Sequence, residues 1–156
     1  MQITSLELWN FRNYDHQAAE FYPGCNIIYG ENGQGKTNIL ESIYMCGFGK
    51  SHKNSREREM IQNGSEEAHV KAVFDSEISS HRVDIHLRKN KAKGMALDRV
   101  PIKKFSELYG RIPVVIFSSE DLDIVKRSPS DRRRFLDMEL CQIDPIYVDN
   151  LIHYNK

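Results

Sequence analysis

One segment constrains the fold more than any other, because it places glycines at fixed offsets before a lysine and a threonine. It matches the pattern GxxxxGK[ST] and consists of Gly30, Glu31, Asn32, Gly33, Gln34, Gly35, Lys36 and Thr37. A short apolar run over residues 25–29 precedes it, and residues 38–48, rich in Ile, Leu, Tyr and Met, follow. This order predicts a buried strand, a tight loop and a mostly buried helix.

The residue types of this loop suit a polyphosphate. Glycines let the backbone curl so that its N–H groups converge on an anion, and the following helix adds its own unpaired N–H groups and positive dipole end. Lys36 supplies a charge for the β and γ phosphates, and Thr37 offers a hydroxyl ligand to Mg²⁺. We therefore interpret the segment as a nucleotide-binding loop and not as a chance glycine-rich turn. We expect ATP and Mg²⁺ as cofactors, held by all eight loop residues.

The loop does not choose between a kinase, a GTPase and an ABC-type ATPase. Hydrolysis usually also needs an acidic Walker B residue directly after four apolar residues. Residues 114–117 are such a run, but Ser118 and Ser119 follow before Glu120 and Asp121. No Walker B residue is assigned, and in an ABC-like protein it would lie outside this chain.

Hydrophobic periodicity predicts the rest of an α/β fold, in which the loop's strand and helix lie against a mixed sheet. Period-2 alternation predicts an antiparallel meander packed alongside. Single strands are expected over residues 3–9, 16–21 and 112–117, and the strands of the meander over residues 70–74, 83–87 and 95–97. Ser128 followed by Pro129 predicts a helix start, as does Asp144 before Pro145.

Length and composition are those of one soluble globular domain, with 156 residues, 40% hydrophobic and 28% charged. The net charge of zero excludes a globally basic nucleic-acid binder. Residues 82–104 nevertheless carry eight basic and two acidic side chains, with Lys89, Lys91 and Lys93 at a hairpin turn. Such lysines are either a solvated edge protected from aggregation or a contact to the DNA backbone.

Three widely spaced cysteines without a paired CxxC argue against a disulfide framework or zinc site. No secretion signal and no apolar run of membrane-spanning length is found in the sequence. We expect a cytoplasmic protein without membrane contact and without a metal beyond the Mg²⁺ of the nucleotide.

Several motifs in order along the chain resemble the RecF family, in the SMC-like branch of the ABC ATPases. They are Asn10-Phe11-Arg12-Asn13-Tyr14, the loop with its continuation through Tyr44, Gly49-Lys50-Ser51-His52, Glu120-Asp121-Leu122 and Arg132-Arg133-Arg134-Phe135-Leu136-Asp137. The resemblance runs from residue 3 to the last residue.

This resemblance implies a two-lobed head that dimerises around two ATP molecules. It implies slow ATP hydrolysis coupled to duplex-DNA binding near single-strand gaps, with RecR as a partner in loading RecA. Residues 1–156 would be the N-terminal ATP-binding part of the head, and the signature motif and Walker B would lie beyond residue 156. We therefore expect a fragment that binds nucleotide weakly and, alone, turns over little ATP.

The resemblance also adds individual residues to the expected site. It places Arg12 and Asn13 among the nucleotide contacts, although Arg12 could equally be a surface arginine paired with Asp15 or Glu20. It makes Glu120, at the position of the ABC Q-loop, a contact to Mg²⁺ or water. Lys53 stands where the family usually has arginine, so a forked guanidinium is replaced by a single ammonium.

Three consecutive arginines, Arg132 to Arg134, fall in the first turns of the helix expected after Ser128. Local charge pairing, such as Asp137 with Arg133, is the favoured reading, and phosphate or interlobe contact is the alternative. Two other functions remain open at this stage. One is a small P-loop kinase, although no Arg-rich lid follows the loop helix. The other is a non-catalytic DNA-interaction domain clamped by nucleotide.

Overall fold

The computed structural model describes residues 1–53, 55–104, 107–118 and 128–154. Its strands are Gln2–Phe11 (β1), Tyr14–Glu20 (β2), Glu67–Asp75 (β3), Ser80–Arg88 (β4), Gly94–Leu97 (β5) and Val100–Pro101 (β6). Its helices are Lys36–Phe48 (α1), Glu57–Met60 (α2), Pro129–Ile143 (α3) and Pro145–Tyr154 (α4). The described part contains no helix long and apolar enough to cross a membrane.

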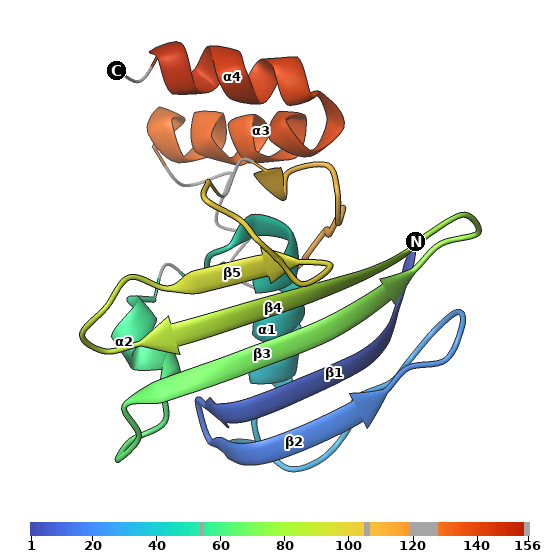
Figure 1. Ribbon diagram of the computed structural model, residues 1–156, viewed down its shortest axis with the longest axis vertical. Helices are drawn as coiled ribbons and strands as arrows, with labels where there is room; N and C mark the ends of the chain where they lie inside the picture. Colours follow the sequence, from blue (N-terminus) through green and yellow to red (C-terminus); the bar gives the residue numbers. More distant parts are fainter. Residues whose placement is uncertain (54, 105–106, 119–127, 155–156) are drawn as a thin grey trace.

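The six strands form one sheet in the order β2-β1-β3-β4-β5-β6, and each neighbouring pair is antiparallel (Figure 1). Along β3 and β4, buried apolar residues alternate with half-exposed polar ones. The buried set turns to one face because side chains alternate along a strand. The predicted meander over residues 70–97 and the α/β class are confirmed.

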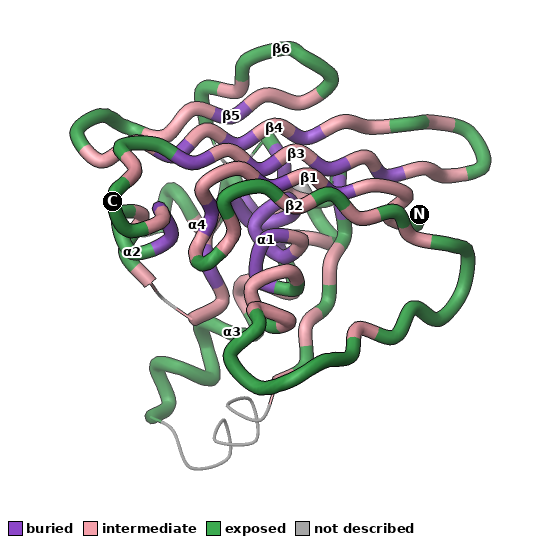
Figure 2. Tube along the Cα trace, turned by 90° about the horizontal axis from the view of Figure 1, so that it is seen from below, coloured by how far each residue is buried: buried purple, intermediate pink, exposed green. Residues whose placement is uncertain are grey.

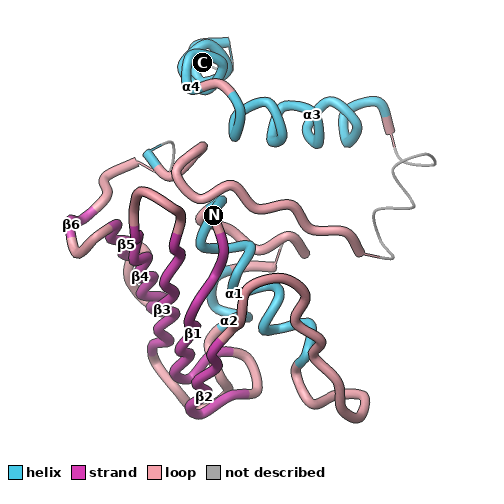
Figure 3. The backbone as a smooth tube through the Cα atoms, turned by 90° about the vertical axis from the view of Figure 1, so that its right-hand side faces the viewer, coloured by secondary structure: helices cyan, strands magenta, loops and turns pink. Residues whose placement is uncertain are grey.

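Helix α1 lies against the apolar face of the sheet. None of the described helices covers the opposite face (Figure 3). Met45 and Cys46 on α1 are fully buried in the core that the strands build. The helix begins after Gly35 and ends at Gly49, whose N–H donates to the Met45 carbonyl at 2.8 Å. Gly49 has a φ of 68°, a left-handed conformation that glycine adopts without a Cβ clash.

Two predicted strands, over residues 25–29 and 112–117, are wrong for this chain. Neither joins a ladder in the described residues. Ile27 is 80% exposed and Tyr29 is 90% exposed, and Val115 and Phe117 are also largely exposed. Figure 2 shows the buried positions along the strands of the sheet and along α1 instead. An apolar run becomes a buried parallel strand only when neighbouring strands satisfy its backbone groups and cover its faces. The described chain supplies no such neighbours, so the sheet is antiparallel throughout and not mixed.

The predicted helix start at Ser128 is confirmed, since its side chain accepts a hydrogen bond from the Asp131 N–H and Pro129 follows. Helices α3 and α4 form a helical hairpin at one end of the molecule (Figure 1). Gln142 joins this hairpin to the body, because its Oε1 accepts from the Val114 N–H at 2.8 Å.

The predicted pair of Asp137 with Arg133 is wrong. Asp137 instead accepts a hydrogen bond from the Tyr147 hydroxyl at 2.6 Å. The packing of α4 on α3 brings the Tyr147 hydroxyl to Asp137, a contact between helices that spacing along α3 alone does not reveal.

Candidate nucleotide-binding site

The glycine-rich loop connects the body of the sheet to the first turn of α1. Three of its glycines have positive φ: 146° at Gly30, 83° at Gly33 and 98° at Gly35. Side chains with a Cβ rarely adopt such angles, so the backbone path of the loop depends on glycine. The path brings successive backbone groups around the start of α1, as an anion-binding loop requires.

Lys36 is half-buried, and its side chain folds back onto the loop. Its Nζ donates to the carbonyl oxygens of Gly30 at 2.8 Å and Glu31 at 2.6 Å. The ammonium is thereby held over the concave side of the loop, where a phosphate would approach. Both ends of the predicted motif therefore converge in space.

A depression of about 300 Å³ opens beside the loop. It is lined by Asn32, Gly33, Gly35, Lys36, Thr37, Asn38 and Lys53. It contains two ammonium groups and one exposed threonine hydroxyl, and none of its lining side chains is acidic. These donors match an anion with an associated cation, which is the chemistry expected of Mg-ATP.

The turn between β1 and β2 closes onto this loop. Asn13 Nδ2 and the Tyr14 hydroxyl both donate to the Gln34 carbonyl, at 3.1 and 3.2 Å. Asn38 Nδ2 on α1 donates to Asn13 Oδ1 at 2.9 Å. A Cβ on Gly35 would lie only 2.5 Å from Asn13 Oδ1 and 2.7 Å from the Tyr14 hydroxyl. The contact therefore requires glycine at position 35, for space as well as for φ.

Tyr14 was not among the predicted site residues. The signal available in the sequence was its place at the end of the segment Asn10 to Tyr14, directly after the predicted Arg12 and Asn13. Asn13 and Tyr14 act on the loop backbone and define its shape at Gln34.

Arg12 is held by a fully buried carboxylate, Glu41 on α1. Its Nε donates to Glu41 Oε2 at 2.9 Å and its Nη2 to Glu41 Oε1 at 2.6 Å. Nη2 also donates to Ser55 Oγ at 2.7 Å, and Nη1 donates to the Glu59 carbonyl at 2.8 Å. The alternative that paired Arg12 with Asp15 or Glu20 is wrong. The predicted contact of Arg12 with nucleotide stays a prediction.

Ser51 and Lys53 complete the surroundings of Glu41. The Ser51 hydroxyl donates to Glu41 Oε1, and Lys53 Nζ lies 3.8 Å from Oε2. Lys53 Nζ also lies 3.4 Å from Asn38 Oδ1, at the rim of the depression. Lys53, which stands where arginine is expected, thus connects the buried Glu41 carboxylate with the depression beside the loop.

Burial alone would raise the pKa of the Glu41 carboxyl. The hydrogen bonds from Arg12 and Ser51 and the charges of Arg12 and Lys53 outweigh burial, so its pKa lies below its ordinary value. Glu41 therefore remains an anion in the native protein, and the cations around it are held in place.

Two other sets of predicted residues lie elsewhere. Glu120 lies outside the described residues. At the β4–β5 turn, Lys89 pairs with Glu66 at 3.3 Å and Lys93 with Glu57 at 2.6 Å. Lys91 is exposed and has no such partner within the described ranges. Local carboxylates therefore neutralise part of the predicted basic tip.

This loop between sheet and helix, with its lysine folded over it, defines a P-loop NTPase. The family described as AAA domain matches residues 5–155, and the chain belongs to that family.

Within it, the chain is similar to proteins named DNA replication and repair protein RecF. It is 56% identical to that of Lachnoclostridium phytofermentans and 45% identical to that of Clostridium botulinum Loch Maree. Each match covers the whole of this chain and 43% of the relative. The chain thus spans less than half the length of these curated relatives. The predicted resemblance to RecF is confirmed.

Solved structures agree with this placement. The structure described as recombination mediator protein RecF-ATP in the RecFOR pathway has a TM-score of 0.93 and 34% identity, covering 99% of this chain and 42% of that one. The SMC head domain from Thermotoga maritima has a TM-score of 0.58 and 22% identity, covering 71% of this chain and 42% of that one. The second likeness concerns the fold alone.

Proposed function

We propose that this chain binds Mg-ATP at the loop of residues 30–37, as part of a protein that acts in DNA replication and repair. One observation carries the proposal: Lys36 Nζ is held over a loop shaped by three positive-φ glycines, beside an open depression without acidic side chains. The RecF relatives, one of them described with ATP, support the same ligand. Thr37 is the proposed ligand to Mg²⁺, with Glu120 as a second contact.

Calorimetric titration of the chain with Mg-ATP, beside a Lys36→Ala variant, tests this proposal. We expect saturable binding that the variant loses, because the ammonium is the main charge facing the phosphates. A matched control is Lys103→Ala, an exposed lysine outside the site. Equal binding by Lys36→Ala and the parent would overturn the assignment of the loop.

Further parts of the protein complete the function in this proposal. The exposed apolar residues of segments 25–29 and 112–117 support a longer protein in which additional strands cover them. The signature motif and Walker B residue would come with those parts, together with ATP-dependent dimerisation and slow hydrolysis. The longer protein would act at gapped duplex DNA with RecR. Measuring ATP turnover tests this proposal. We expect hydrolysis by a longer chain that includes those parts and none by residues 1–156 alone.

We further propose that the β4–β5 turn contacts the DNA backbone in the longer protein through Lys89, Lys91 and Lys93. The positive balance of residues 82–104 supports this, and the ion pairs of Lys89 and Lys93 argue that Lys91 contributes most. Such a contact would be independent of DNA sequence and sensitive to salt.

A further inference from the structure

Four aromatic rings form a row across the face of the sheet that none of the described helices covers. This aromatic row consists of His16 on β2, Trp9 on β1, His69 on β3 and His86 on β4, which are successive partners in the strand register. The Trp9 ring centroid lies 5.4 Å from that of His16 and 5.1 Å from that of His69. The His69 centroid lies 5.9 Å from that of His86. The rings therefore contact one another across four neighbouring strands.

The two-residue period of the strands turns the aromatic row away from the core. Leu8 beside Trp9 and Val70 beside His69 are fully buried, so the rings next to them point to the opposite face. Trp9 is half-buried there, because the flanking histidine rings cover part of its surface. A tryptophan on such a face offers apolar area that association can bury, and tryptophan is enriched at protein interfaces.

The charge around the aromatic row is negative. Every second residue from the row along its four strands lies on the same face. The charged ones are the carboxylates Glu7, Glu20, Glu67, Asp75 and Asp84 and the cations Lys71, Arg82 and Arg88. Lys71 Nζ lies 3.1 Å from Glu7, and Arg82 Nη2 lies 2.7 Å from Asp84, so carboxylates of the same face already hold these two cations.

A hollow of about 460 Å³ lies on this face, over β1 and β2. Glu7, Glu20 and Lys71 contribute to its lining. Space is left between them because Ser5 and Ala18, which also line the hollow, are small. Glu7 is bonded to Lys71, whereas the Glu20 carboxylate is exposed. The hollow therefore has room and negative charge for a cationic side chain.

Aromatic rings and carboxylates together favour a guanidinium as the ligand. A guanidinium stacks flat on a ring and bonds a carboxylate with two donors, whereas an ammonium has no flat face. Nucleobases would also stack on the row, but the excess of carboxylates disfavours the phosphates that accompany them. Burial lowers the pKa of the His69 ring, although Asp84 opposes this, so the ring stays neutral at neutral pH and does not repel a cation.

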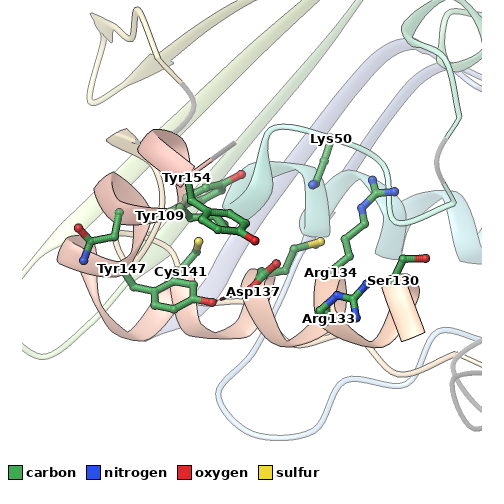
Figure 4. Close-up of a pocket in the computed structure, with 12 residues that line it drawn as sticks. Lys50, Tyr109, Ser130, Arg133, Arg134, Asp137, Cys141, Tyr147 and Tyr154 are labelled. Atoms are coloured by element: carbon green, nitrogen blue, oxygen red, sulfur yellow. Dashed lines mark hydrogen bonds between the residues drawn. The ribbon is translucent and has the colours of Figure 1, made fainter. Parts of the chain in front are cut away.

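The aromatic row is distinct from the cavity between the α3–α4 hairpin and the body of the protein. Lys50 and Tyr109 line that cavity from the body, and its volume is about 630 Å³ (Figure 4). Since Lys50 comes just after α1, the cavity lies on the helix side of the sheet. No residue of the row lines it, so a ligand bound there does not touch Trp9.

We propose that the aromatic row is a docking surface for a partner protein, which it binds through an extended segment rich in arginine. The guanidinium groups of that segment stack on Trp9 and bond to Glu20 beside the hollow. The surface is separate from the proposed ATP site at residues 30–37, and binding there needs no nucleotide.

Trp9 is the one tryptophan of the chain, so tryptophan fluorescence reports this surface directly. The probe is a synthetic peptide with arginine at every second position and threonine between. A peptide with lysine at the same positions and oligothymidylate are the comparisons. We expect a saturable change with the arginine peptide and about fivefold weaker binding of the lysine peptide, because stacking on the ring is lost.

Three outcomes of this titration would overturn the proposal. The first is no saturable change with the arginine peptide. The second is equal affinity for the two peptides, since attraction between opposite charges would then suffice. The third is tighter binding of oligothymidylate than of the arginine peptide, which would assign the aromatic row to single-stranded nucleic acid.

Glu20→Gln removes the exposed carboxylate, and we expect it to weaken the arginine peptide about fivefold. Glu77→Gln makes the same change at the exposed β3–β4 turn and is the matched control, with unchanged affinity expected. Equal affinities in the two variants would contradict the assignment of Glu20.

The role of the ring is tested with a fluorescent label on the peptides. Trp9→Phe keeps a ring and should retain most of the preference for arginine over lysine, whereas Trp9→Leu should lose it. A purely structural role of Trp9 would not change this preference. A preference that persists in Trp9→Leu would therefore show that the row does not bind the guanidinium.

Discussion

Arg12 and Glu41 are joined by two hydrogen bonds, of 2.9 and 2.6 Å, between the end of β1 and the middle of α1. The carboxylate is fully buried, and the guanidinium is largely buried. Because α1 begins at the phosphate loop, this pair ties the loop helix to the sheet. The Arg12 backbone has a φ of 57°, so the chain accepts a left-handed residue at the point where the pair forms.

Arg12→Ala should destabilise the protein by about 3 kcal/mol, because it leaves a buried carboxylate without its main partner. Arg12→Lys should lose less, since it keeps the charge but not the forked geometry. The free energy of unfolding in urea measures both. Arg58→Ala, at an exposed position of α2, is the control and should change little. Equal losses at positions 12 and 58 would mean that the pair does not stabilise the fold.

The stability of the protein should fall in acid through Glu41. Its pKa in the native state lies below the ordinary value of 4.5, so the unfolded chain takes up the proton more readily. The stabilisation is therefore present above about pH 4.5 and is lost as the pH falls through the lower native pKa. Unfolding free energies measured between neutral and acid pH should show a smaller slope in Glu41→Gln. The variant should still show some dependence of the unfolding free energy on pH, because the pKa of Asp98 is also lowered in the native protein. An unchanged slope in the variant would contradict this assignment.

Gly35→Ala should separate the loop from the β1–β2 turn. The new Cβ meets Asn13 and Tyr14 and also strains a φ of 98°. Gly24→Ala is a matched control, because it has a φ of 91° and nothing within 4 Å. Thermal unfolding should show a loss about 2 kcal/mol greater for Gly35→Ala, the cost of overpacking added to that of strain. Similar losses for the two variants would show that the turn gives way freely.

Lys53→Ala should weaken Mg-ATP binding about fivefold, since a partly exposed cation contributes about 1 kcal/mol. Lys53→Arg should bind at least as well as the parent, because a guanidinium can hold phosphate with two donors. Calorimetric titration measures both, with Lys103→Ala as the reference. Unaltered affinity in Lys53→Ala would remove Lys53 from the nucleotide site.

Lys91→Glu should lower DNA affinity of the longer protein more than Lys89→Glu does, because Lys89 already has a carboxylate partner. The reduction should shrink as salt rises, as expected when fewer counterions are released. Fluorescence anisotropy with duplex DNA over a range of salt concentrations measures it. Equal affinities for the parent and Lys91→Glu would leave the turn as a solvated edge.

Local patterns in the sequence determined much of this protein. The glycines and lysine of residues 30–37 specify an anion-binding loop, because only glycine reaches the required φ angles without strain. The alternation in β3 and β4 and the cap at Ser128 act over a few residues, so they can be recognised without knowledge of the fold.

The tertiary structure alone decided which distant side chains meet. Arg12 and Glu41 are 29 residues apart, whereas the candidate partners Asp15 and Glu20 both lie closer to Arg12 in the sequence. The same holds for Tyr14 on the loop and for Lys50 facing α3. It also decided that residues 25–29 and 112–117 form no strands, since an apolar run becomes a strand only where neighbours satisfy its hydrogen bonds. Spacing along the chain specifies local geometry, whereas partners across the fold depend on how the sheet and helices pack.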